Sequence, residues 1–214
     1  MKGPEGRCPQ TAGSRLECKI VAVAASAGGL KALSGLLAEL PGDFPAPIAV
    51  VQHLDPSHRS LMAEILNRRT DLWVKEAQEG ENLLAGTVYV APPNRHFLVT
   101  TDRRVSLTES ELVHFLRPSA DLLFESVAAC YGPRAVAVVL TGTGGDGSMG
   151  VQAVKARGGT VLAQDEATSE HFGMPSAAIR TGCVDRVLAL EALAGAIEEL
   201  AGSVRPEPVR GGRA

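Results

Sequence analysis

Short runs of alanine and β-branched residues alternate with stretches of helical periodicity along most of this 214-residue chain. A buried strand followed by an amphipathic helix, repeated several times, is the pattern of a parallel sheet covered by helices. Aromatic residues make up only 4% of the chain, so the core has to be built from Val, Leu, Ile and Ala. This composition favours helices packed on a parallel sheet over an aromatic-rich β-sandwich.

The pattern can be divided into elements. Residues 87–92, 96–100 and 104–110 are closely spaced apolar runs separated by turn residues, which predicts antiparallel hairpins. The sequence therefore predicts a doubly wound α/β fold, with a mostly parallel sheet, helices on both faces and an antiparallel hairpin insertion. The other expected strands are 18–25, 47–52, 135–140, 160–164 and 183–188, and the expected helices are 28–40, 57–69, 119–131, 148–157, 176–181 and 191–201.

The two ends of the chain differ from its middle. Residues 1–17 show neither the apolar runs of a strand nor the periodicity of a helix, and residues 203–214 are rich in Gly, Pro and Arg. We expect both segments to be flexible tails. The length between them, residues 18–202, suits one domain with a sizeable buried core.

Charge and cysteine content exclude several classes of protein. The net charge of −3, without a clustered basic excess, predicts no nucleic-acid partner. The N-terminus lacks the apolar segment of a signal peptide, and no apolar run reaches the ~18 residues that span a bilayer, so we expect a cytoplasmic protein without membrane insertion. The four cysteines are scattered without metal-ligand spacing. They predict reduced thiols, and we expect neither a metal nor another cofactor.

Ser26 lies between a predicted strand and a predicted helix, in the segment VAVAASAGGL. A serine on such a tight turn projects its hydroxyl clear of the sheet, and the helix N-terminus behind it offers free amides for an oxyanion. The segment is close to a nucleophile elbow, with Ala24 where that motif has its first glycine. An N-cap serine beside a packing diglycine, or a phosphate-binding loop, would give the same pattern.

Two further polar residues follow predicted strands. His53 lies in VVQHLDP and Asp146 in LTGTGGDGSMG. An imidazole can take the proton of a serine hydroxyl, and an aspartate can fix the tautomer of that imidazole. Because the carboxyl ends of parallel strands meet at one edge of a sheet, we expect Ser26, His53 and Asp146 to converge as a catalytic triad. The alternatives are a metal site at His53, Asp55 and His58, and a helix N-cap at Asp146.

The glycine-rich segments AASAGG and TGTGGDG leave a second function open. A phosphate- or nucleotide-binding regulatory module could use both loops as a cradle. The glycines are not followed by a Walker lysine, and no clear acidic partner for a ribose is present, which counts against this function. His96 and His171 are interpreted as structural or loop histidines, and residues 117–119 as a loop that leads into a capped helix.

Six ordered blocks of the sequence resemble the catalytic domain of the CheB family of chemotaxis protein-glutamate methylesterases. They span about residues 18–200. The resemblance implies a serine esterase whose catalytic residues are Ser26, His53 and Asp146. It implies hydrolysis of glutamate γ-methyl esters on the cytoplasmic helices of chemoreceptors, with release of methanol during receptor adaptation, and deamidation of receptor glutamines. The blocks are VAVAASAGGL, VVQHLDPSHRSLMAEIL, VKEAQEGENLLAGTVYVAPPNRHFLV, VHFLRPSADLLFESVA, VVLTGTGGDGSMG and LAQDEATSEHFGMPSAAIRTGCVDRVL.

The sequence departs from the family pattern in three places. Ala27 stands where members usually have threonine, and Thr143 stands where they usually have methionine. The family places oxyanion stabilisation near the second of these segments, so we expect the backbone amides of Ala27 and Thr143 to form the oxyanion hole. The members that define the family also carry an N-terminal receiver domain with a phosphorylated aspartate. About 17 residues precede the first predicted strand here, so we expect a stand-alone methylesterase without phosphorylation control in cis.

Overall fold

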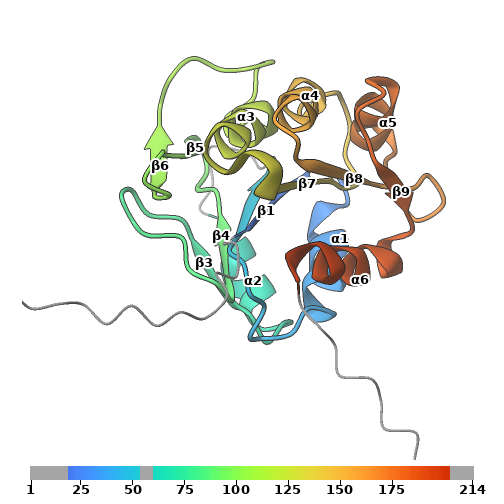
Figure 1. The fold of residues 1–214 in the computed structure, drawn as a ribbon. Coiled ribbons are helices and arrows are strands. Elements are labelled where there is room, and N and C mark those ends of the chain that lie inside the picture. Colours follow the sequence, from blue (N-terminus) through green and yellow to red (C-terminus); the bar gives the residue numbers. More distant parts are fainter. Residues whose placement is uncertain (1–18, 54–59, 203–214) are drawn as a thin grey trace, which may run out of the picture.

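The structure, a computed structural model, describes residues 19–53 and 60–202. Seven strands form one parallel sheet, seen at the centre of Figure 1. They are β1 (Ile20–Ala25), β2 (Ile48–Gln52), β3 (Trp73–Glu76), β4 (Thr87–Val90), β7 (Ala135–Val139), β8 (Thr160–Gln164) and β9 (Arg186–Leu188). Their order across the sheet is β3-β4-β2-β1-β7-β8-β9, so β1 lies in the middle.

Helices cover both faces of this sheet (Figure 1). On one face lie α1 (Gly29–Ala38), α2 (Met62–Asn67) and α6 (Leu190–Ala201), and on the other lie α3 (Ala120–Tyr131), α4 (Ser148–Ala156) and α5 (Gly173–Arg180). A short 3-10 helix, η1 (Gly132–Arg134), joins α3 to β7. Each face has its own apolar core. Every residue of β1 and β7 is buried, because both faces of these apolar strands are covered.

The doubly wound fold predicted from the sequence is confirmed, but its middle part differs from the prediction. Among the strands of the described residues, only β5 (His96–Val99) and β6 (Val105–Thr108) form an antiparallel pair. The prediction that residues 87–92 belong to antiparallel hairpins was wrong, because β4 pairs in parallel with both β2 and β3. Three successive residues of β4 are buried, which is typical of a parallel strand covered on both faces rather than of a hairpin with one exposed face.

The connections between the strands create a crevice at one edge of the sheet. The chain leaves β1 through α1 on one face, and it leaves β7 through α4 on the opposite face. The two loops therefore diverge between neighbouring strands, and such a topological switch point is where doubly wound sheets bind ligands. Ser26 follows β1, His53 follows β2, and Asp146 lies in the loop after β7. The topology thus brings all three predicted residues to the same edge.

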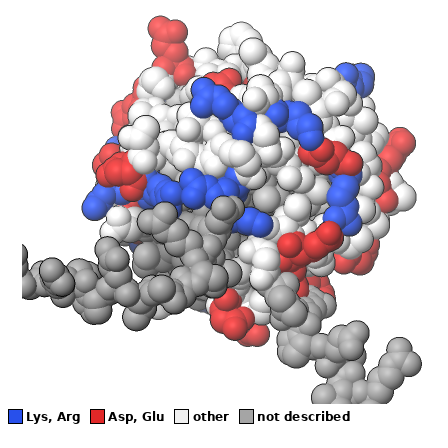
Figure 2. Space-filling view, viewed as in Figure 1, with Lys and Arg blue, Asp and Glu red and all other residues white. Residues whose placement is uncertain are grey.

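The remaining expectations concern the surface and the chain ends. Acidic and basic side chains are interspersed on the face shown in Figure 2. Among the described helices, none has the length and apolar character that crossing a bilayer requires. The predicted tails, as well as Asp55 and His58 of the alternative metal site, lie outside the described residues.

Candidate active site

The backbone at Ser26 is fixed from several sides. Its N–H donates to Thr141 O at 3.0 Å, and its carbonyl accepts from Gly29 N at 2.8 Å and from Gln52 Nε2 at 2.7 Å. Gly28 has a φ of 77°, in the left-handed region that favours glycine, and it forms the N-cap of α1. The turn therefore holds Ser26 at the end of β1 and directly before the helix.

The loop after β7 lies against this turn. A Cβ added at Gly142 would be 2.8 Å from Ser26 Cβ and 2.3 Å from Met174 Sδ, so the approach requires a glycine. Within residues 19–53 and 60–202, the amides of Ala27 and Thr143 donate no hydrogen bond to the protein. Both predicted oxyanion donors are therefore uncommitted in the described part of the chain, one on each side of the crevice.

His53 is held beside Ser26 by strand pairing. Ala25 lies opposite Gln52 in the parallel register of β1 and β2, so Ser26 and His53 are the next pair. His53 N donates to Ala25 O at 3.2 Å, and Gln52 Nε2 links the two strand ends by donating to His53 O at 3.0 Å and to the carbonyl of Ser26. Gln52 is therefore a positioning residue for both Ser26 and His53.

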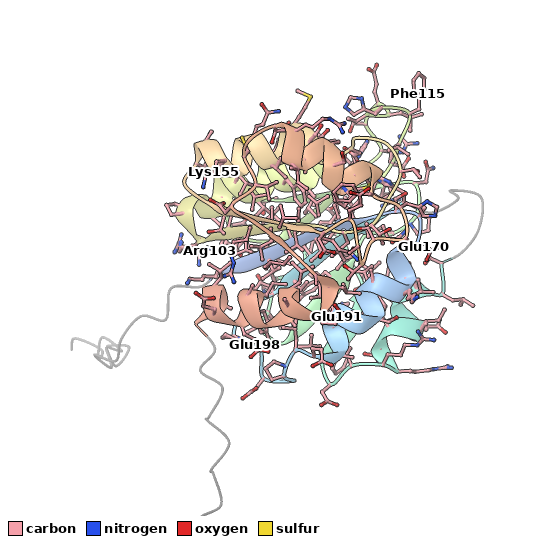
Figure 3. All side chains as sticks on the ribbon, turned by 90° about the vertical axis from the view of Figure 1, so that its right-hand side faces the viewer. Arg103, Phe115, Lys155, Glu170, Glu191 and Glu198 are labelled. Atoms are coloured by element: carbon pink, nitrogen blue, oxygen red, sulfur yellow. The ribbon has the colours of Figure 1, made fainter. Side chains whose placement is uncertain are left out.

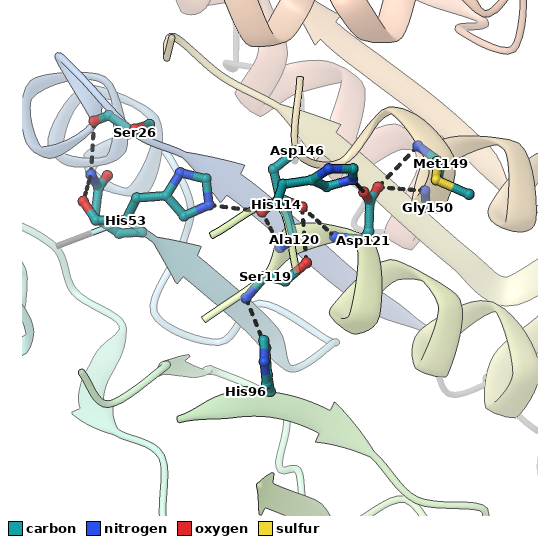
Figure 4. Close-up of polar contacts among 11 residues, drawn as sticks. Ser26, His53, His96, His114, Ser119, Ala120, Asp121, Asp146, Met149 and Gly150 are labelled. Atoms are coloured by element: carbon teal, nitrogen blue, oxygen red, sulfur yellow. Dashed lines mark hydrogen bonds and ion pairs between the residues drawn. The ribbon is translucent and has the colours of Figure 1, made fainter. Parts of the chain in front are cut away.

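The imidazole of His53 contacts Asp146 directly. His53 Nε2 lies 2.8 Å from Asp146 Oδ2, and Figure 4 draws the imidazole between Ser26 and this carboxylate. Because a carboxylate only accepts hydrogen bonds, Nε2 carries the proton and Nδ1 keeps its lone pair. Nδ1 is thus the atom that can take a proton from a hydroxyl. The described residues include no hydrogen-bond partner of the Ser26 hydroxyl.

Asp146 is a buried carboxylate at the N-terminus of α3. Oδ1 accepts from Ser119 Oγ at 2.9 Å and from Asp121 N at 3.1 Å, while Oδ2 accepts from Ala120 N at 2.6 Å as well as from His53. Burial acts to raise the pKa of Asp146, but the hydrogen bonds from His53, Ala120 and Asp121 outweigh it and lower the pKa. Asp146 is therefore ionised and able to stabilise an imidazolium.

The alternative role of Asp146 as the cap of the following helix was wrong. Gly147 is the N-cap of α4, and Asp121 Oδ1 accepts from Met149 N at 2.9 Å and from Gly150 N at 2.7 Å. Asp146, which precedes α4, thus caps α3, and Asp121, which lies in α3, caps α4 (Figure 4). Burial, helped by the charge of Asp146, raises the pKa of Asp121. This exchange joins α3 to the loop that carries Asp146.

His96 extends the same network. This fully buried residue accepts from Ser119 N at Nδ1 (3.2 Å) and lies 3.0 Å from Glu111 O at Nε2. The Ser119 hydroxyl in turn donates to Asp146. His96 is thus a structural histidine, as interpreted from the sequence, but its place behind Asp146 was not predicted. Gln52, Ser119 and Asp121 were also not predicted, although each is a polar residue next to or within an apolar run, which is the one signal that the sequence offers.

We expect His96→Leu to lower both stability and activity. Leucine removes the partner of Glu111 O and leaves Ser119 N, in a fully buried residue, without an acceptor, and the loss at Ser119 costs about 1–3 kcal/mol of unfolding free energy. A shifted Ser119 also displaces Asp146, so kcat should fall by about 10- to 100-fold. His96→Gln, which retains a donor and an acceptor, should recover part of both losses, and the exposed His171→Leu is a matched control for stability. Equal stability and activity of the leucine variant and wild type would contradict this role.

The same variant makes a prediction about pH. Burial lowers the pKa of His96 below its usual value of 6.5, so the folded protein prefers the neutral imidazole. Its contribution to stability is therefore present above pH 6.5 and is lost as the pH falls through the folded-state pKa. Urea unfolding at several pH values should show the difference between wild type and His96→Leu becoming smaller in acid.

A doubly wound α/β domain with a serine, a histidine and an aspartate at its switch point has the layout of a serine hydrolase. A model of the CheB methylesterase family matches residues 21–197. The chain belongs to this family, and the resemblance found in the sequence is confirmed.

Individual relatives agree with this assignment. The chain is 46% identical over 182 residues to protein-glutamate methylesterase/protein-glutamine glutaminase 2 of Anaeromyxobacter dehalogenans, covering 85% of this chain and 53% of the relative. It is 44% identical over 191 residues to the protein of the same name from Koribacter versatilis, covering 86% and 52%. The chain thus spans about half the length of these curated relatives. The crystal structure of the Thermotoga maritima CheB methylesterase catalytic domain superimposes with a TM-score of 0.82 at 37% identity, covering 87% of this chain and 99% of that one.

Proposed function

We propose that this protein is a serine esterase that hydrolyses glutamate γ-methyl esters on the cytoplasmic helices of chemoreceptors, giving glutamate and methanol in the cytoplasm. We propose further that it deamidates receptor glutamines at the same site. The observation that supports this most strongly is the 2.8 Å contact between His53 Nε2 and Asp146 Oδ2, next to Ser26 at the end of the neighbouring strand.

In the proposed acylation step, Ser26 Oγ attacks the ester carbonyl carbon while His53 Nδ1 takes the hydroxyl proton. Asp146 keeps the other imidazole proton on Nε2 and stabilises the imidazolium. The amides of Ala27 and Thr143 donate to the oxyanion of the tetrahedral intermediate. When this intermediate collapses, the carbon–oxygen bond to the methoxy group breaks, and His53 returns its proton to form methanol.

In the deacylation step, His53 Nδ1 takes a proton from water as the water oxygen attacks the glutamyl–Ser26 ester. The second intermediate expels the serine oxygen, which recovers its proton from His53, and glutamate is released. A glutamine side chain follows the same two steps with ammonia as the leaving group, because amide and ester hydrolysis share a tetrahedral intermediate. The site requires no other group for these steps.

The test is a measurement of methanol released from a methylated cytoplasmic fragment of a chemoreceptor, with ammonia release from the unmodified glutamine form followed in parallel. A serine-directed fluorophosphonate should label Ser26, detectable by peptide mass spectrometry. Hydrolysis of a small ester without any methanol from the receptor fragment would overturn the proposed substrate. Labelling of a different serine would overturn the proposed nucleophile.

The alternative of a phosphate-binding module has weaker support. In a phosphate loop, the first amides of the following helix bind the anion. Here the amides of Met149 and Gly150 in α4 are already bound by Asp121, and the carboxylate of Asp146 lies in the same loop. Two buried carboxylates at these helix ends oppose a bound phosphate.

A further inference from the structure

A pocket of about 250 Å³ opens beside the catalytic imidazole. Apart from His53 and Asn94, its lining comes from the segment that joins β6 to α3, residues 109–119, which we call the β6–α3 loop. Because His53 belongs both to this pocket and to the candidate active site, the pocket adjoins the place where an ester carbonyl would meet Ser26. The residues that the loop contributes are Leu112, Phe115, Leu116, Arg117 and Pro118.

The tip of the β6–α3 loop has an unfavourable backbone conformation. Val113 and Leu116 exchange two hydrogen bonds, of 3.2 and 2.8 Å, across a two-residue turn. The turn residues His114 and Phe115 both have positive φ, of 50° and 64°. Turns with positive φ at both central positions strongly prefer Asn-Gly, and a bulky residue there is an outlier. Such outliers cluster at sites of function.

The side chain at this tip is as unusual as its backbone. Phe115 is 94% exposed and projects from the periphery of the molecule, as Figure 3 shows, and Leu112 is 53% exposed nearby in the loop. The turn geometry does not explain a phenylalanine at this position, because asparagine or glycine would fit the turn better. Burial does not explain it either, because the ring is almost fully exposed. Within the described residues, the exposed ring of Phe115 therefore has no evident role in folding.

The loop is also held firmly at its base. Arg117 Nη1 donates to the carbonyls of Glu109 and Ser110, both at 2.7 Å, and Nε and Nη2 donate to Asn94 Oδ1 at 3.0 and 2.8 Å. His96 Nε2 bonds to Glu111 O. The guanidinium of Arg117 is thus used to shape the loop. A loop that is ordered before binding loses little conformational entropy when a partner docks.

We infer that the β6–α3 loop is the docking element for the substrate helix, with Phe115 and Leu112 packed against apolar residues that lie one to two turns from the esterified glutamate. The inference rests on the proposed function and names the part of the chain that recognises the receptor. Exposed aromatic anchors that are already rigid carry much of the binding energy at protein interfaces. On a helix, residues three and four positions apart share a face, so an ester at Ser26 brings its helical neighbours to the pocket.

The decisive variant is Phe115→Gly, which keeps His114, because His114 Nε2 lies 3.5 Å from Asp121 Oδ2 in the network behind Asp146. This change relieves the backbone and removes the aromatic ring, so the melting temperature should stay the same or rise. The ratio of kcat/KM for the methylated receptor fragment to kcat/KM for a small glutamate methyl ester should fall by about tenfold or more. A second variant, Phe115→Asn, which tolerates positive φ, should show the same fall. A role in folding alone would leave this ratio unchanged.

Trp73→Ala is the matched control. Trp73 is 70% exposed and lies at the amino end of β3, on the sheet edge opposite the site, so its removal should leave the ratio as in wild type. An unchanged ratio in both tip variants overturns the inference, as does a wild-type protein whose self-association depends on Phe115, which would make the tip an interface between copies. Failure of the proposed function is recognised separately, because wild type would then release no methanol from the receptor fragment.

Discussion

Ser26→Ala is expected to reduce kcat for methanol release by about 10⁴- to 10⁶-fold while leaving the fold intact. In the proposed mechanism, the variant lacks the oxygen that forms the acyl intermediate, so only direct attack by water remains, assisted by the rest of the site. The stability cost should be small, because the Ser26 hydroxyl makes no hydrogen bond to a described residue and the backbone contacts of this turn do not depend on the side chain. Circular dichroism and thermal unfolding should match wild type.

Ser106→Ala provides a control for this measurement. Ser106 is a partly buried serine of β6, in the antiparallel pair rather than at the edge of the main sheet. Its removal should leave methanol release near the wild-type rate. A Ser26→Ala variant that releases methanol at a comparable rate would show that another group performs the attack.

The position of the site could be predicted from the sequence because of the fold class. Strands that are apolar along their whole length predict a parallel sheet, and a parallel sheet brings its carboxyl ends to one edge. A polar residue directly after such a strand is therefore placed at that edge without knowledge of the tertiary structure. Ser26 and His53 are placed in this way. Asp146 does not follow β7 directly, but it lies in the glycine-rich loop after that strand and so at the same edge.

The details of the network could not be predicted in this way. Asp121 and Asp146 are 25 positions apart, and either carboxylate is a reasonable cap for the helix that follows it. Each carboxylate caps the other helix because α3 packs closely on α4. This packing is so close that a Cβ at Gly150 would lie 2.6 Å from Phe124 Cβ. The choice of His53 Nε2 as the atom facing Asp146 likewise depends on side-chain directions that sequence spacing does not determine.

The strands that were misassigned or missed have a similar explanation. β3 is a four-residue edge strand with two exposed residues, Trp73 and Glu76, so its apolar signal is too short to recognise. β4 is fully apolar at its end but lies close in sequence to β5, and short spacing is the usual sign of a hairpin. A parallel strand differs from a hairpin strand by its burial on both faces, and this burial depends on packing against helices.

Asp146→Asn is the second variant with a large expected effect. The carboxylate accepts four hydrogen bonds, two at each oxygen. An asparagine offers one oxygen and one NH₂ group, which can only donate, so one pair of donors loses its acceptor. If the NH₂ group faces His53, Nε2 must become the acceptor and the ring proton moves to Nδ1. That tautomer cannot take a proton from Ser26, and kcat should fall by about 10⁴-fold, the size of the same change in a serine protease triad.

The substitution should also destabilise the protein in a pH-dependent manner. The donors at the N-terminus of α3 lose a charged partner, which costs about 1–3 kcal/mol of unfolding free energy at neutral pH. Because the folded-state pKa of Asp146 is lowered from 3.8, this contribution is present above that value and is lost as the pH falls through the folded-state pKa. The difference between wild type and Asp146→Asn in denaturant unfolding should therefore diminish in acid.

The double variant Ser26→Ala with Asp146→Asn distinguishes a catalytic unit from two independent effects. In the proposed mechanism, Asp146 acts on the reaction through His53, and the imidazole has no nucleophile to activate once Ser26 is gone. The activity of the double variant should then equal that of Ser26→Ala alone, whereas independent contributions would multiply to a further loss of about 10⁴-fold. Unfolding free energies should behave in the opposite way and add, because the Ser26 hydroxyl is not part of the hydrogen-bond network around Asp146. A multiplied loss of activity would mean that Asp146 supports the fold but not the chemistry of Ser26 and His53.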